Sequence, residues 1–113
     1  MKYGNKLAAY LFTSLFAFSA LFVAGCTARA ATEQSGEANF KKYCQACHPN
    51  GGNVVRPTKN LSRAVRERNG ITTVNDIVNL MRKPGEDMTT YDEKTLSEND
   101  AINIAEYIVK TFK

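Results

Sequence analysis

Apolar residues along the 113-residue chain form one long run, followed by short helical stripes. From Leu7 to Ala24 the chain is apolar apart from Thr13, Ser14 and Ser19. Beyond Gly36 the apolar residues recur three or four positions apart, which places them on one face of an α-helix. No alternating run of useful length indicates a strand. The pattern therefore predicts an all-α domain over 36–113.

Helix-breaking residues delimit the first two of about four expected helices. Apolar and aromatic residues from Phe40 onward share helical spacing, so the first helix begins near Gly36 and Pro49 stops it. A loop then leads to a short helix over 61–68, which Asn69-Gly70 closes.

Capping residues delimit the last two helices. Thr73 can cap a third helix that ends before Pro84. Ser97, with Asp100 three positions on, resembles a capping box in which Asp replaces the usual Glu. The apolar faces expected for these helices are Ile77, Leu80 and Met81 on the third, and Ile102, Ala105, Ile108, Val109 and Phe112 on the last.

The N-terminal run has the order of an export signal. Lys2 and Lys6 supply positive charge, the apolar run follows, and small residues lead to Cys26. Val23-Ala24-Gly25-Cys26 resembles the lipobox of bacterial lipoproteins, whose Cys is acylated and becomes the mature N-terminus. An uncleaved transmembrane helix is the alternative, because the run of 18 residues is barely long enough to cross the hydrocarbon core. We expect a lipoprotein signal peptide over 1–25, lipidation of Cys26 and a membrane anchor in the cell envelope.

Removal of this signal changes the charge as well as the length. Lys2 and Lys6 leave with residues 1–25, so the remaining 88 residues carry 13 basic and 11 acidic side chains. The mature chain therefore has a formal charge near +2, and nucleic-acid binding has no support. Residues 26–35 are small and polar, and we expect them to form a lipidated tether without regular structure.

Cys44-Gln45-Ala46-Cys47-His48 is the most informative stretch of the chain. Two thiols three positions apart can each form a thioether with one vinyl group of a haem, and the following His then lies under the iron. A zinc site needs about four ligands, and a thioredoxin-like dithiol needs a βαβ setting; the mature domain offers neither. The motif predicts one covalent haem c, attached at Cys44 and Cys47, with His48 as an axial iron ligand.

The sixth iron ligand is expected to be a methionine. His48 is the only histidine, so bis-histidine ligation is excluded, and a thioether sulfur is a natural partner that raises the reduction potential. Met81 continues the apolar face of the third helix, where core packing explains it. Met88 lies in a polar loop after Pro84-Gly85, and a loop can carry a ligand to the open haem face. We expect Met88 to be the distal ligand.

Over 36–113 these residues resemble the class I c-type cytochromes. Gly36, Phe40 and Cys44 match the Gly-x-x-x-aromatic-x-x-x-Cys opening of that family. The resemblance implies four or so helices around one haem, with the glycine and the aromatic residue of the first helix packed against an aromatic residue of the last. In this sequence that partner is expected to be Tyr107.

The resemblance also assigns Pro57 to the cofactor site. In the family, the carbonyl of the proline after the haem motif accepts a hydrogen bond from the proximal His, which fixes the imidazole tautomer. The segment GGNVVRPTKNL and the Pro-Gly-x-x-Met loop further resemble the short photosynthetic-type cytochromes of the c6 kind. With the lipobox, they resemble monohaem lipoprotein cytochromes of metal-reducing bacteria. Thr89 and Tyr91 depart from the usual Met-Pro-x-Phe sequence, a departure that can loosen the ligand loop.

Electron transfer, not enzymatic catalysis, is the function these features imply. A six-coordinate iron leaves no open position for a substrate, and the redox chemistry belongs to the cofactor. We expect a monomeric outer-membrane lipoprotein, facing the periplasm or the surface, that carries single electrons between envelope redox proteins, including in respiratory or extracellular metal reduction. The alternatives are a five-coordinate haem enzyme or gas-binding protein, and an envelope assembly protein with a structural haem.

Charged residues near the ligand loop offer a means of steering a partner, and equally fit the solvated faces of an ordinary domain. The basic stretch consists of Arg56, Lys59, Arg63, Arg66 and Arg68, and the acidic one of Glu86, Asp87, Asp92, Glu93, Glu98 and Asp100.

Overall fold

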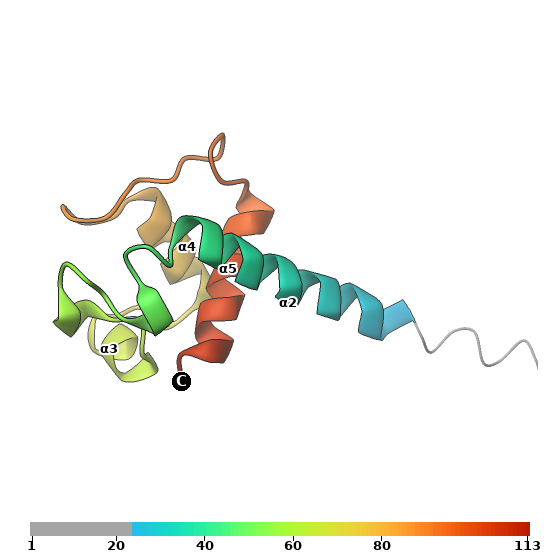
Figure 1. The fold of residues 1–113 in the computed structure, drawn as a ribbon, viewed down its shortest axis with the longest axis horizontal. Helices are drawn as coiled ribbons and strands as arrows, with labels where there is room; N and C mark the ends of the chain where they lie inside the picture. The colour runs from blue at the N-terminus through green and yellow to red at the C-terminus, as the bar shows by residue number, and fades with distance from the viewer. Residues whose placement is uncertain (1–23) are drawn as a thin grey trace, which may run out of the picture. The chain divides into compact units, whose positions relative to one another are not determined.

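The computed structural model describes the backbone of residues 24–113 and the side chains from residue 31 onward. Within this range the helical elements are α2 (Ala24–Tyr43), the 3-10 helices η1 (Pro49–Gly51) and η2 (Pro57–Lys59), α3 (Arg63–Arg68), α4 (Val74–Arg82) and α5 (Glu98–Thr111) (Figure 1). No strand occurs among residues 24–113, and the expected all-α class is confirmed.

The N-terminal predictions fall largely outside the described residues. The apolar run ends where the described backbone begins, and the side chain of the expected lipidation site, Cys26, is not among those described. Among the described residues, no helix combines the length and the hydrophobicity of a membrane span. Residues 31–113 form one compact unit, and the features discussed below belong to it.

Residues 27–35 are helical. The sequence predicted no regular structure for them, and this prediction was wrong. The segment has no apolar stripe, but its Ala, Arg, Glu and Gln residues are good helix formers and it contains no Gly or Pro. Within the compact unit, Asn103 of α5 donates a hydrogen bond to Ser35 Oγ at 3.0 Å, so contacts with α5 begin before Gly36. The role of this segment as a tether stays a prediction.

Gly36 lets α2 and α5 approach each other closely. A Cβ atom built on Gly36 would lie 2.4 Å from the carbonyl oxygen of Asn103. One turn further along α2, the buried Phe40 ring packs against Tyr107, with ring centroids 5.3 Å apart, and against Phe112 at 5.5 Å. The expected contact of Gly36 and Phe40 with Tyr107 is therefore present.

Gly36→Ala is expected to lower the free energy of unfolding by about 1–3 kcal/mol, because the added methyl group must push two helix backbones apart. This loss opposes the roughly 1 kcal/mol that Ala gains over Gly in a helix. Guanidinium unfolding of the purified protein measures the difference. Gln34→Ala, an exposed change on the same helix, is the control and should stay within about 0.5 kcal/mol of the parent. A stability raised by the full helix-propensity gain of roughly 1 kcal/mol in Gly36→Ala would contradict the close approach.

The predicted caps are found at both α4 and α5. Thr73 Oγ1 accepts from the Asp76 amide at 3.1 Å, and the Asp76 carboxylate accepts from the Thr73 amide at 2.8 Å, which completes a capping box. Ser97 Oγ accepts from the Asp100 amide at 3.2 Å and donates to the carboxylate at 2.8 Å. The other oxygen of Asp100 accepts from Asn39 of α2 at 2.8 Å, so this carboxylate links two helices.

The buried face of α5 differs from the expected stripe. Ala101 and Ile104 are fully buried, whereas Val109 is 36% exposed and Ile102 lies at the edge of the core. Helix α5 packs against both α4 and α2. Its buried surface is therefore wider than the predicted apolar stripe and is rotated from it around the helix axis. The buried core of the described residues comprises Phe40, Cys44, Ile77, Val78, Met81, Leu96, Ala101, Ile104, Ala105 and Ile108.

Candidate haem site

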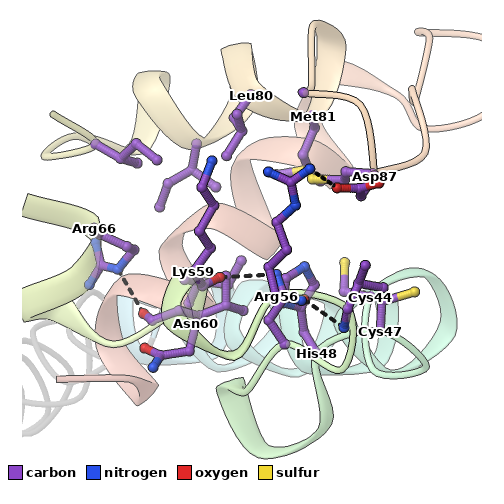
Figure 2. A pocket seen from close by; sticks show the side chains of 18 of the residues that line it. Cys44, Cys47, His48, Arg56, Lys59, Asn60, Arg66, Leu80, Met81 and Asp87 are labelled. Carbon is purple, nitrogen blue, oxygen red and sulfur yellow. Dashed lines mark hydrogen bonds and ion pairs between the residues drawn. The ribbon is translucent and has the colours of Figure 1, made fainter. Parts of the chain in front are cut away.

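A cavity of about 430 Å³ lies between the end of α2, the loops after it, α3, α4 and the loop that follows α4 (Figure 2). Its lining includes Cys44, Cys47, His48 and Met88. Figure 2 shows Cys44, Cys47 and His48 across the cavity from Leu80 and Met81. The volume falls within the 300–1,000 Å³ typical of ligand and cofactor sites.

The two cysteines continue α2 by one further turn. The Cys44 amide donates to Phe40 O at 2.8 Å, and the His48 amide donates to Cys44 O at 2.8 Å. This turn brings both thiols and the imidazole to the cavity wall, with Cys44 buried, Cys47 exposed and neither in a disulfide. The spacing of the motif therefore places the two thiols and the imidazole together at the cavity.

The chemistry of these thiols does not fit a redox-active dithiol. Burial, with a smaller contribution from the neighbouring Cys47, raises the pKa of the Cys44 thiol to about 11. Reactive cysteines instead have a lowered pKa, since the thiolate is the nucleophile. A zinc site also lacks its ligands, because no group of three or more His, Cys, Asp or Glu side chains is placed to hold a metal ion within the described part of the chain.

His48 is held by a hydrogen bond from its own loop. Its Nδ1 lies 2.7 Å from the carbonyl oxygen of Gly52. A carbonyl can only accept, so Nδ1 carries the proton and the Nε2 lone pair is available to an iron ion. This is the tautomer that an axial haem ligand requires.

The family resemblance predicted that the Pro57 carbonyl accepts the hydrogen bond from His48, and this prediction was wrong. Pro57 begins η2, and its carbonyl accepts from the Asn60 side chain at 3.3 Å. Gly52 takes the role because the chain turns sharply after His48, with positive φ at Asn50 and Gly51. That turn folds the Gly52 carbonyl back onto the imidazole four residues earlier.

The two candidate methionines both line the cavity, and they differ in burial. Met81 is 2% exposed and belongs to the core, as its place on the apolar face of α4 predicted. Met88 is half-buried, packs at the edge of that core and comes from the loop between α4 and α5.

The loop that carries Met88 is tied down at Tyr91. The Tyr91 hydroxyl donates to Tyr43 O at 2.6 Å, and the Tyr91 amide donates to Met81 O at 2.9 Å. Arg82 donates to the carbonyls of Tyr91 and Leu96, both at 2.9 Å. Burial raises the pKa of the Tyr91 phenol, which keeps it in its donor form. These bonds restrain the loop although Thr89 stands where the family has a proline.

An ion pair connects the same loop to the segment after the cysteines. Arg56 pairs with Asp87, the residue before Met88, at the cavity (Figure 2). Of the predicted basic stretch, Arg63 and Arg68 are exposed, but Arg66 is 6% exposed and lines the cavity. Sequence reasoning missed Gly52, Tyr91 and Arg66 as site residues, because their roles depend on the path of the chain and not on a local motif.

The residues present fit a covalently bound haem. The cavity offers two free thiols from one turn, an imidazole whose Nε2 is free, thioether and aliphatic walls, and basic side chains. An all-α domain built around such a site defines a c-type cytochrome of class I.

Comparisons with known proteins agree with this assignment. The family model for cytochrome c oxidase, cbb3-type, subunit III matches residues 31–108. Cytochrome c6 of Cyanidium caldarium is 31% identical over 90 residues, which cover 80% of this chain and 81% of that protein. The chain belongs to the c-type cytochrome family that includes cytochrome c6. It is therefore a monohaem electron carrier with one covalently bound haem c.

Solved structures show the same fold. OmcF, an outer-membrane cytochrome from Geobacter sulfurreducens, is 45% identical with a TM-score of 0.68, and the match covers 69% of this chain and 99% of OmcF. Cytochrome c6C of Synechococcus sp. PCC 7002 is 33% identical with a TM-score of 0.65, over 69% of this chain and 94% of that one. The expected likeness to c6-type cytochromes and to an outer-membrane cytochrome is confirmed.

Proposed function

We propose that this protein carries single electrons between redox proteins of the cell envelope, with its haem attached through Cys44 and Cys47 and its iron ligated by His48 and Met88. One observation carries the proposal: a single cavity is lined by two thiols, by the His48 imidazole with its proton on Nδ1, and by the thioether of Met88. When bound, the haem supplies reversible one-electron chemistry at iron.

The protein side chains hold the group and adjust its chemistry. Cys44 and Cys47 would hold the haem at the end of α2 through two thioethers, and the hydrogen bond to the Gly52 carbonyl increases the basicity of the His48 imidazole. A methionine sulfur raises the reduction potential. The buried walls at Met81 and Ile77 exclude water and lower the local polarity, which disfavours the extra positive charge of the oxidised iron.

A redox titration followed by absorption spectroscopy tests this function. We expect one reversible one-electron transition, low-spin spectra in both states, and in the oxidised protein a weak near-red band from sulfur-to-iron charge transfer. High-spin iron with rapid binding of carbon monoxide would instead favour a five-coordinate haem enzyme or gas-binding protein. A reversible potential outside the range of any envelope redox protein would favour a structural haem.

Tyr91→Phe is expected to loosen the Met88 loop without changing the cavity's shape. Loss of the bond to Tyr43 O costs about 1 kcal/mol, so the population with an open loop should rise about fivefold. Imidazole binding to the oxidised protein measures that population, because imidazole competes for the sixth iron position. Tyr107→Phe is the matched control, since its ring packs on Phe40 away from the loop. Equal imidazole affinity in the two variants would contradict the anchoring role.

Export and lipid anchoring at Cys26 are part of the proposal. They are supported by the lipobox and by the likeness to OmcF, which is described as an outer-membrane cytochrome. Cys26→Ser is expected to leave the haem spectrum unchanged and to abolish acylation, so the acyl mass carried by the parent protein is lost. Intact mass of both proteins, produced in a host able to attach haem, measures this. A mature parent protein whose mass includes no acyl chain would contradict a lipid anchor.

A further inference from the structure

Arg66 is a buried cation that has no anionic partner among the described residues. Its side chain is 6% exposed, and it is the one charged residue in the buried set of this part of the chain. Its Nε donates to Leu61 O at 2.9 Å and its Nη2 donates to Phe112 O at 3.4 Å. Both acceptors are neutral carbonyls. Burial of a guanidinium without a counter-charge is costly, so an anion is expected beside it.

The location of Arg66 indicates where that anion comes from. Arg66 lines the haem cavity, and Figure 2 shows it at the far end from Cys44 and Cys47. In haem, the vinyl groups that form the thioethers and the two propionates lie on opposite edges of the ring. A haem attached at the cysteines therefore directs its carboxylates toward the end of the cavity where Arg66 lies.

The charges of the cavity wall match this arrangement. Arg56, Lys59 and Arg66 are its basic residues. Arg56 is already paired with Asp87, whereas Lys59 and Arg66 have no carboxylate partner among the described residues. Two cations without carboxylate partners would thus meet a cofactor that brings two carboxylates. Arg66 is the more buried of the two, so its interaction is screened least by water.

We propose that Arg66 binds a haem propionate through a charge-assisted hydrogen bond inside the cavity. This inference rests on the haem attachment proposed above. A fixed positive charge near the ring favours reduced iron, which carries one positive charge fewer than oxidised iron. Arg66 is therefore a positioning residue that also raises the reduction potential.

The alternative role of Arg66 is purely structural, as a donor to the carbonyls at the ends of two segments. Arg66→Gln separates the two roles, because the amide keeps a donor and removes the charge. Arg66→Lys keeps the charge in a shorter side chain. Arg63→Leu is the matched control: Arg63 lies on the same helix, but its side chain is 69% exposed and pairs with Glu67.

Reduction potentials and the NMR signals of the haem propionates test the proposal on the purified haem-loaded protein. Arg66→Gln is expected to lower the potential and shift the propionate signals, Arg66→Lys to restore most of both, and Arg63→Leu to change neither. If Arg66→Gln only loses stability, with potential and propionate signals unmoved, the role is structural and the proposal is overturned. Should Arg66→Gln fail to fold, a pH titration of the propionate signals in the parent protein replaces it: a carboxylate paired with Arg66 stays ionised below the usual range of a carboxylic acid, and two propionates that both titrate in that usual range would overturn the proposal.

The same samples distinguish this failure from failure of the proposed function. Covalent haem in the intact mass and a near-red band in the parent protein test attachment and sulfur ligation, independently of Arg66. Their presence with an unmoved potential in Arg66→Gln rejects the role of Arg66 alone. Their absence rejects the proposed function itself.

Discussion

Met88→Ala is expected to remove the sulfur–iron bond, abolish the near-red band and lower the reduction potential by on the order of 0.1 V or more. Axial ligands set haem potentials over a range of about 0.8 V, and loss of a thioether removes the ligand that favours reduced iron. Met88 is half-buried in a restrained surface loop, so the truncation should cost little packing. Spectroelectrochemistry of the oxidised and reduced protein measures both effects.

Met81→Ala is the matched control and has a different expected result. Met81 is 2% exposed in the core, so its truncation should cost about 2–5 kcal/mol of unfolding free energy and leave the near-red band in place. The comparison therefore separates ligation from packing. A band that survives in Met88→Ala and disappears in Met81→Ala would show that the other sulfur binds the iron.

The sequence predicts local features of this protein well and features that depend on neighbours less well. The Thr73 cap and the Asn69-Gly70 helix end were predicted because each is decided within a few residues. The buried face of α5 was placed wrongly because it depends on which helices flank it. Ala101 carries little hydrophobic signal, yet it is fully buried between them.

The candidate site shows the same division. Cys44, Cys47 and His48 lie within one turn, so their convergence follows from the helix itself. Gly52 is the hydrogen-bond acceptor for His48 because positive φ at Asn50 and Gly51 turns the chain back toward the imidazole. The family resemblance had instead assigned this role to Pro57.

Arg66 could not be assigned to the cavity from the sequence for a related reason. Helix α3 has only six residues, which is too few for a helical periodicity to separate a buried arginine from exposed ones. Its neighbours Arg63 and Arg68 are exposed, so charge alone grouped the three together.

The stability of this fold is expected to depend on the bound haem. A small domain has a limited core, and here the core surrounds a cavity of about 430 Å³. At about 24 cal/mol per Å³, leaving such a space unfilled costs on the order of 10 kcal/mol, which equals the whole stability of a typical domain. Removal of the cofactor should therefore unfold the protein.

Cys44→Ser with Cys47→Ser is expected to abolish covalent attachment and, with it, most of the helical signal. Each single variant retains one thioether and should keep a haem-bound fold of lower stability. Intact mass reports the covalent haem, and far-ultraviolet circular dichroism reports the helices. A colourless double variant with native helicity and cooperative unfolding would show that the helices pack without the cofactor, and the cavity would then be a minor cost. A helical signal that returns when haem is added to the double variant would instead confirm that filling the cavity, more than the covalent bond, stabilises the fold.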